Sequence, residues 1–298
     1  MHTMVTFEYL SAFIIGTMVG SFANVCIHRL PWRQSLVVPG SHCPQCQQPI
    51  RPWHNIPLLS YVWLGGRCAY CHATISWHYP LVELLCGVLY VFLYHHFGFT
   101  AQGVVFMLLT TALLVVSFID LVHKIVPDAI TLPGILVGLV ASLGLTATGI
   151  IDAMAGLCLG GGLFLLIALL SRGGMGGGDI KLIAMIGAFL GWQAVLVTIL
   201  FGAFLGALVG ISLIVMKKKG RKDPVPFGPF LAIGALIAMV WGHALFAWYV
   251  HSPHRSGHTA ASRAFSLVDC AGPRYHTYES AINKGNMVTC TQPSREHP

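Results

Sequence analysis

The feature that most restricts the fold of this chain is a series of long apolar stretches that carry almost no charge. Only 9% of its 298 residues are charged, against about 25% in ordinary soluble proteins. About 20 apolar residues suffice to cross a bilayer as a helix, and lipid forces such a segment to satisfy its backbone hydrogen bonds internally. The expected spans are Phe7–Ile27, Leu81–Phe97, Gly103–Ile119, Ala129–Thr146, Ala153–Leu170, Ile180–Leu190, Ala194–Met216 and Phe230–Val250. The sequence therefore predicts an all-α polytopic membrane protein with about eight transmembrane helices.

Basic residues occur in every second connection between these stretches. Twelve of the 17 lie there: Arg29, Arg33, Arg51, Arg67, Lys124, Arg172, Lys181, Lys217, Lys218, Lys219, Arg221 and Lys222. The intervening connections contain no Lys or Arg. Because positively charged loops stay on the cytoplasmic side, we expect these connections inside and both termini outside the cytoplasm. The net charge of +7 is thus not gathered on one soluble face, so we expect no nucleic acid partner.

Two of the stretches differ from the rest. Ile180–Leu190 has about 11 residues, roughly 17 Å as a helix, so it either crosses with help from its flanks or a thinned bilayer, or is re-entrant. The basic-residue pattern favours a crossing. The first stretch has no basic residue before it, and Arg29 and Arg33 follow it, so we expect a membrane anchor rather than a cleaved signal peptide.

Two aspartates lie at the edges of apolar stretches. Asp179 directly follows a run of glycines that includes Gly176 and Gly178, and Asp120 closes the third stretch. As a residue favoured before helices, Asp179 also fits a helix N-cap, but a cap does not explain the glycines. The predicted topology puts both carboxylates on the cytoplasmic side. Two neighbouring carboxyl groups that share a proton are the arrangement with which aspartic proteases activate water.

Several motifs resemble those of the type IV prepilin peptidase family, membrane aspartyl proteases with a Gly-x-Gly-Asp motif. This motif stands as Gly176-Gly177-Gly178-Asp179, and the first aspartate matches Asp120, with Pro127-Asp128 downstream. The stretch Gly20-Ser21-Phe22-Ala23-Asn24-Val25, followed by Arg29-Leu30-Pro31, resembles the family's N-terminal signature. The likeness runs from about Gly16 to Pro229.

The resemblance implies that Asp120 and Asp179 are catalytic and that Gly176 and Gly178 belong to the catalytic loop. The implied substrates are precursors of type IV pilins or type II secretion pseudopilins, from which a short basic leader is removed at the bacterial inner membrane. It also implies methylation of the new N-terminus with S-adenosylmethionine. A proton-coupled transporter and a non-enzymatic zinc-bearing assembly factor remain open as other classes. The aspartates lie at one membrane edge rather than the midplane, which disfavours the transporter.

Four cysteines define a module between the first two spans. Cys43-Pro44-Gln45-Cys46 and Cys68-Ala69-Tyr70-Cys71 are two pairs with the spacing of a tetrahedral zinc site. A disulfide is less favoured because cytosolic thiols stay reduced. Residues 28–80 are too few to fold on a core of their own, so structural Zn²⁺ is expected to stabilise them.

The remaining candidates concern methyl transfer, which rests on the resemblance alone. Asn24, Gly66, Arg67 and Glu83 are possible contacts to the methyl donor or the substrate. Asn24 fits equally a hydrogen bond to a neighbouring helix, and Glu83 an arginine pair or contact with lipid headgroups. The expected divisions are a first helix at 7–27, the zinc module at 28–80, a membrane peptidase domain at 81–250 and a disordered non-cytoplasmic tail at 251–298.

Overall fold

The computed structural model describes residues 2–171, 176–216 and 226–251. Within these ranges the regular elements are helices, accompanied by two isolated β-bridges. They are α1 (His2–Arg29), η1 (Leu30–Trp32), η2 (Pro52–Asn55), α2 (Leu59–Trp63), α3 (His78–Phe97), α4 (Ala101–His123), α5 (Asp128–Ala141), α6 (Ile150–Leu170), α7 (Gly177–Val215) and α8 (Gly228–His251). The predicted all-α class is therefore confirmed. The predicted tail at 251–298 falls, apart from His251, outside the described residues.

Six of the described helices are long and apolar enough to cross a membrane: α1, α3, α4, α6, α7 and α8. The shorter α5 takes the place of the predicted span Ala129–Thr146. Two predicted spans, Ile180–Leu190 and Ala194–Met216, fall within the single element α7. The chain is thus confirmed as rich in membrane-spanning helices, whereas eight crossings remain a prediction.

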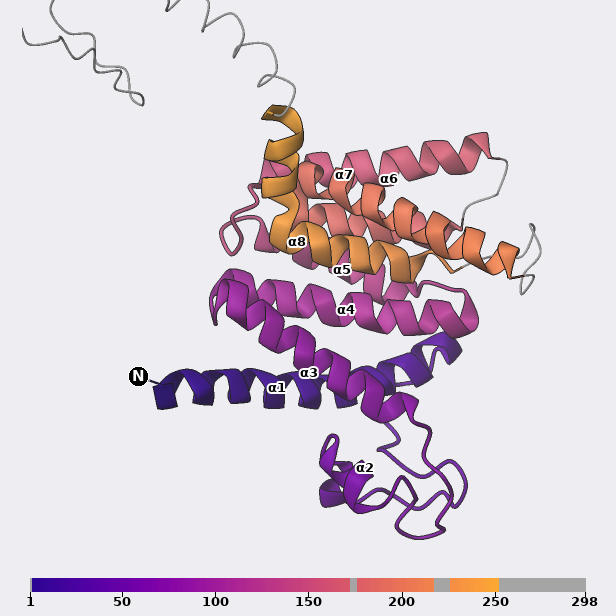
Figure 1. Cartoon of the computed structure of the whole chain (residues 1–298). Coiled ribbons are helices and arrows are strands. Elements are labelled where there is room, and N and C mark those ends of the chain that lie inside the picture. Colours follow the sequence, from indigo (N-terminus) through magenta and orange to yellow (C-terminus); the bar gives the residue numbers. More distant parts are fainter. Residues whose placement is uncertain (1, 172–175, 217–225, 252–298) are drawn as a thin grey trace, which may run out of the picture. The chain divides into compact units, whose positions relative to one another are not determined.

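Gly191 divides α7 into two parts. Its φ of 80° and ψ of 175° are not helical, and a positive φ of this size is one that glycine adopts without strain. Figure 1 shows the second part of α7 running back toward the side on which the first part begins. One glycine therefore supplies the reversal that the sequence predicts as a short connection.

Small residues let neighbouring helices approach closely. A Cβ atom added to Gly20 of α1 would lie 2.8 Å from Glu83 Cα in α3, and one added to Gly156 of α6 would lie 2.6 Å from Gly187 O in α7. Such contacts replace the hydrophobic driving force that lipid cannot provide between helices. They fix α1 on α3 and α6 on α7.

One continuous core joins α3 and α4 to the helices of the second half of the chain. Its fully buried side chains include Leu113, Leu182, Ile186 and Leu231, from α4, α7 and α8. Figure 1 shows that the ends of α4 and α6 and the starts of α5, α7 and α8 lie on the same side of the bundle. The core therefore holds the end of α4 beside the starts of α7 and α8.

Candidate active site

Asp120 occupies the last turn of α4, and its side chain is buried. The residue is 5% exposed, and its Oδ2 accepts a hydrogen bond of 2.9 Å from the backbone N–H of Gly228, the first residue of α8. Because the first N–H groups of a helix have no partner within the helix, they are available to a carboxylate. The start of α8 thus holds the carboxyl group of Asp120 in place.

Asp179 lies in the first turn of α7 and is half-buried. The helix begins at Gly177, its N-cap is Gly176, and no side chain caps it. Asp179 is therefore not the N-cap residue, and that alternative is wrong. Its carboxyl group and that of Asp120 are close enough to interact electrostatically.

The glycine run brings the start of α7 against the connection between α4 and α5. A Cβ atom added to Gly178 would lie 2.7 Å from Val126 Cβ, so a larger residue would push the helix away. Gly176 lies beside Asp179, since its added Cβ would be 3.6 Å from the Asp179 Oδ2. The close packing at Gly178 explains why glycine precedes the aspartate.

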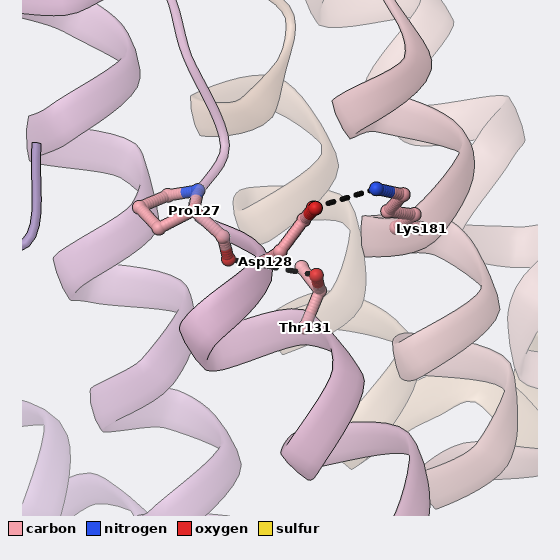
Figure 2. A network of polar contacts seen from close by, with 4 residues as sticks. All are labelled: Pro127, Asp128, Thr131 and Lys181. Carbon is pink, nitrogen blue, oxygen red and sulfur yellow. Dashed lines mark hydrogen bonds and ion pairs between the residues drawn. The ribbon is translucent and has the colours of Figure 1, made fainter. Parts of the chain in front are cut away.

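Asp128 belongs to a separate ion pair. Its Oδ1 lies 2.7 Å from Nζ of Lys181, with side chains 57% and 41% exposed. Figure 2 shows Lys181 of α7 reaching the start of α5, where Thr131 also donates to the carbonyl of Pro127. The pair links α5 to α7 beside Asp179, but Asp128 already has a cationic partner and is exposed.

The two aspartates together have the features of an acid–base pair. Asp120 is buried and hydrogen-bonded, Asp179 is half-buried, and a negative charge on Asp120 opposes ionisation of Asp179. Carboxyl groups in this relation favour a state with one proton between them. Such a pair is able to deprotonate water with one carboxyl and protonate a leaving group with the other.

The four cysteines of the predicted zinc module lie together. The Sγ atoms of Cys43, Cys46, Cys68 and Cys71 are all within 4.8 Å of one another. The two cysteine pairs have the same backbone conformation. The N–H of Gln47 donates to Cys43 O, and the N–H of His72 donates to Cys68 O. Gln47 and His72 both have a φ of 57°. Two tight turns that aim four sulfurs at one point fit a tetrahedral Zn²⁺ ion.

The acidity of these thiols also fits a cation. Backbone N–H groups of Cys71 and Tyr70 lower the pKa of Cys68 to about 6. The N–H of Ala73 favours the thiolate of Cys71 as well, but burial and the neighbouring sulfurs outweigh it and raise the pKa to about 11. Each thiolate thus makes ionisation of its neighbouring thiols harder. A divalent cation among the four sulfurs would stabilise all of them as thiolates.

Comparison with known proteins matches the cysteine module and the two aspartates to two separate family models. The family model described as "Bacterial Peptidase A24 N-terminal domain" matches residues 14–97, and the model described as "Type IV leader peptidase family" matches residues 107–211. A Stutzerimonas stutzeri protein named prepilin leader peptidase/N-methyltransferase is 41% identical over 270 residues, which cover 81% of this chain and 93% of that protein. The chain belongs to the type IV leader peptidase family.

Two further members show how widely the likeness extends. Proteins with the same name from Pseudomonas aeruginosa and Legionella pneumophila are 40% and 36% identical, over 81% and 82% of this chain and 93% and 95% of their own lengths. No solved structure matches the chain. The matched regions of the type IV leader peptidase family contain the cysteine module, Asp120 and Asp179.

Asn24 and Glu83, two candidates in the first matched region, join α1, α3 and the cysteine module. Asn24 Nδ2 donates to Tyr79 O at the start of α3, at 3.0 Å, which is the interhelical hydrogen bond considered from the sequence. Glu83, 9% exposed, accepts a hydrogen bond of 2.9 Å from the N–H of Leu58, and the Ser21 side chain lies next to it. Among the described residues it forms no pair with an arginine.

Gly66 and Arg67 lie directly before Cys68. Gly66 has a φ of +67°, and an added Cβ would be 3.1 Å from Cζ of Tyr61. Arg67 is exposed, and its backbone forms an isolated antiparallel β-bridge with Thr74 around the second cysteine pair. These positions shape the module, and they do not contact Asn24 or Glu83 by any hydrogen bond in the described structure.

Gly228 is the site residue that the sequence analysis missed. It stands in Pro226-Phe227-Gly228-Pro229, which follows a basic stretch and precedes an apolar one. A Cβ atom at Gly228 would lie 2.8 Å from Asp120 Oδ2. The local signal was a glycine between prolines at a helix start, but its partner lies 108 residues away and is visible only in three dimensions.

Proposed function

We propose that this protein is a membrane aspartyl endopeptidase that removes the short basic leader from type IV prepilins or type II secretion pseudopilins. The observation that carries the proposal is the pairing of a buried, hydrogen-bonded Asp120 with Asp179 at one end of the helix bundle. The names of the relatives, prepilin leader peptidase/N-methyltransferase, support the same activity.

In the proposed reaction one aspartate is ionised and the other protonated. The ionised carboxylate takes a proton from water while the water oxygen attacks the carbonyl carbon of the scissile peptide. The protonated carboxyl donates to the carbonyl oxygen, which gives a tetrahedral diol. The proton taken from water then passes to the leaving nitrogen as the C–N bond breaks, and the diol returns a proton to the other carboxylate. The N–H of Gly228 keeps Asp120 oriented throughout, and Gly178 lets the start of α7, which carries Asp179, pack closely on Val126.

We also propose that the chain methylates the new N-terminus. S-adenosylmethionine would supply a methyl group as an electrophile on sulfur, and the candidate contacts are Asn24, Gly66, Arg67 and Glu83. Two of them are connected to the module's segment, Asn24 through Tyr79 and Glu83 through Leu58, which supports this proposal. Zn²⁺ held by Cys43, Cys46, Cys68 and Cys71 would stabilise the module at residues 28–80.

The proposed site faces the cytoplasm from the inner membrane, with eight crossings and both termini on the other side. Support comes from the Lys and Arg residues in every second connection and from the reversal of α7 at Gly191. A basic leader would be retained on the cytoplasmic side, where it would meet the aspartates. The proposed peptidase domain comprises residues 81–250 and is preceded by the first helix at 7–27.

The test uses purified full-length protein, a prepilin and S-adenosylmethionine labelled in its methyl group. Leader loss and methylation are read separately. Asp120→Asn and Asp179→Asn should each abolish cleavage while leaving the protein folded, because an amide cannot exchange the required proton. Cleavage by Asp120→Asn at the unsubstituted rate, or no cleavage by the unsubstituted protein, would reject the proposed peptidase activity.

A further inference from the structure

A groove of about 370 Å³ separates α1 from the cysteine module. Met18, Phe22 and Val25 of α1 line one wall, and the other includes Pro57, next to the hydrogen-bonded N–H of Leu58. The groove thus extends along the side of a membrane-spanning helix. It belongs to neither the aspartate pair nor the four sulfurs.

Three of the α1 residues that line the groove, Met18, Phe22 and Val25, are apolar. Phe22 is 54% exposed and Met18 is 61% exposed, although both belong to a helix long enough to span a membrane. Met18 lies about 16 Å along the helix from Arg29, at 1.5 Å per residue. A molecule that touches Met18 therefore meets the apolar part of a helix long enough to span a membrane, and an apolar surface on that molecule fits there.

The carboxyl group of Glu83 lies next to the polar part of the groove. The side chain of Ser21, which lines the groove, lies next to that of Glu83. Leu58, beside the lining residue Pro57, donates its N–H to the Glu83 carboxyl group. Glu83 is 9% exposed, and no Lys or Arg pairs with it in the described part of the chain.

One cationic side chain lines the groove, but it already has hydrogen-bond partners. Arg29 lines the groove, but its guanidinium donates to the backbone carbonyls of Ser35 and Pro39. A carboxyl group in a spanning helix is costly unless a cationic or hydrogen-bonding partner compensates it. The N–H of Leu58 already compensates Glu83 in part. A positively charged group near Ser21 would add the cationic partner that Glu83 lacks among the described residues.

We propose that this groove binds the N-terminal end of a processed apolar helix, with its first residues on Met18, Phe22 and Val25 and its free α-amine toward Ser21 and Glu83. The inference rests on the proposed function, since leader cleavage produces such an end. The polar adenosine and amino-acid parts of the methyl donor fit the apolar residues Met18, Phe22 and Val25 less well than an apolar helix does. Glu83 is then a positioning residue for the amine.

The first test measures methylation kinetics with processed pilin as substrate. Phe22→Ala and Glu83→Gln should each raise the KM for processed pilin about tenfold, the loss of about 1.4 kcal/mol of binding. For Phe22→Ala, the KM for S-adenosylmethionine and the rate of leader cleavage should stay within twofold. Phe7→Ala is the matched control, because Phe7 is an exposed aromatic residue of α1 outside the groove.

The second test does not depend on methylation. A benzophenone amino acid at position 22 of the full chain in nanodiscs should cross-link to processed pilin, and one at position 7 should not. Cross-linking to the methyl donor alone, a rise in only its KM, or equal behaviour of positions 7 and 22 would overturn the inference. Loss of leader cleavage in the unsubstituted protein would instead reject the proposed function.

Discussion

Gly228→Ala is expected to reduce leader cleavage strongly without touching either aspartate. An alanine Cβ at this position would lie 2.8 Å from Oδ2, 3.3 Å from Cγ and 3.4 Å from Cβ of Asp120. The same Oδ2 accepts the 2.9 Å hydrogen bond from the Gly228 N–H. Asp120 is buried at the end of α4, so its carboxyl group must move away from α8 and lose that bond.

The expected size follows from the strength of such a bond. A hydrogen bond to a charged group contributes about 1.5–3 kcal/mol, and each 1.36 kcal/mol in the barrier changes a rate tenfold. If the bond holds Asp120 in its reactive position, its loss should lower kcat for cleavage by roughly 10- to 150-fold. Displacement of the carboxyl group itself would place the effect at the upper end.

The assay compares kcat for leader removal by purified unsubstituted protein, Gly228→Ala and Gly210→Ala. Gly210 is the matched control, because a Cβ added at this position of α7 meets nothing within 4 Å. Thermal unfolding of all three proteins should show that the bundle stays intact. A Gly228→Ala protein that is folded and cleaves as fast as Gly210→Ala would refute the role assigned to the start of α8.

Three further predictions concern the surroundings of the aspartates and the cysteine module. Gly178→Ala should slow cleavage, because its Cβ would collide with Val126 at 2.7 Å, whereas Gly162→Ala, with open space around it, should not; equal rates would contradict the packing argument. Asp128→Asn should keep its activity and lose at most about 1 kcal/mol in unfolding free energy, since it removes only an exposed ion pair; an inactive, folded Asp128→Asn would assign catalysis to the wrong carboxylate. Chelation, Cys43→Ser or Cys68→Ser should destabilise the module and impair methylation more than cleavage; freshly purified protein without zinc by metal analysis would argue against the site.

The sequence by itself determines the class of the fold and the chemistry of the candidates. Low charge and long apolar stretches leave helices as the structure that satisfies the backbone in lipid, and the described residues form helices accordingly. The spacing of the cysteine pairs predicts their cluster because each pair needs only a local turn. Asp179 and Asp120 stand out because carboxylates at the edges of apolar stretches are costly.

Only the tertiary structure decides which groups meet across long separations. The hydrogen bond from Gly228 to Asp120, the ion pair of Lys181 with Asp128 and the contact of Glu83 with Leu58 join residues 108, 53 and 25 positions apart. Hydrophobic periodicity identifies a buried face but not the helix that covers it, and small residues permit contact with several neighbours. The close approach of backbones at Gly178 and Gly228 arises from the packing of α4, α7 and α8 together, which no local pattern in the sequence specifies.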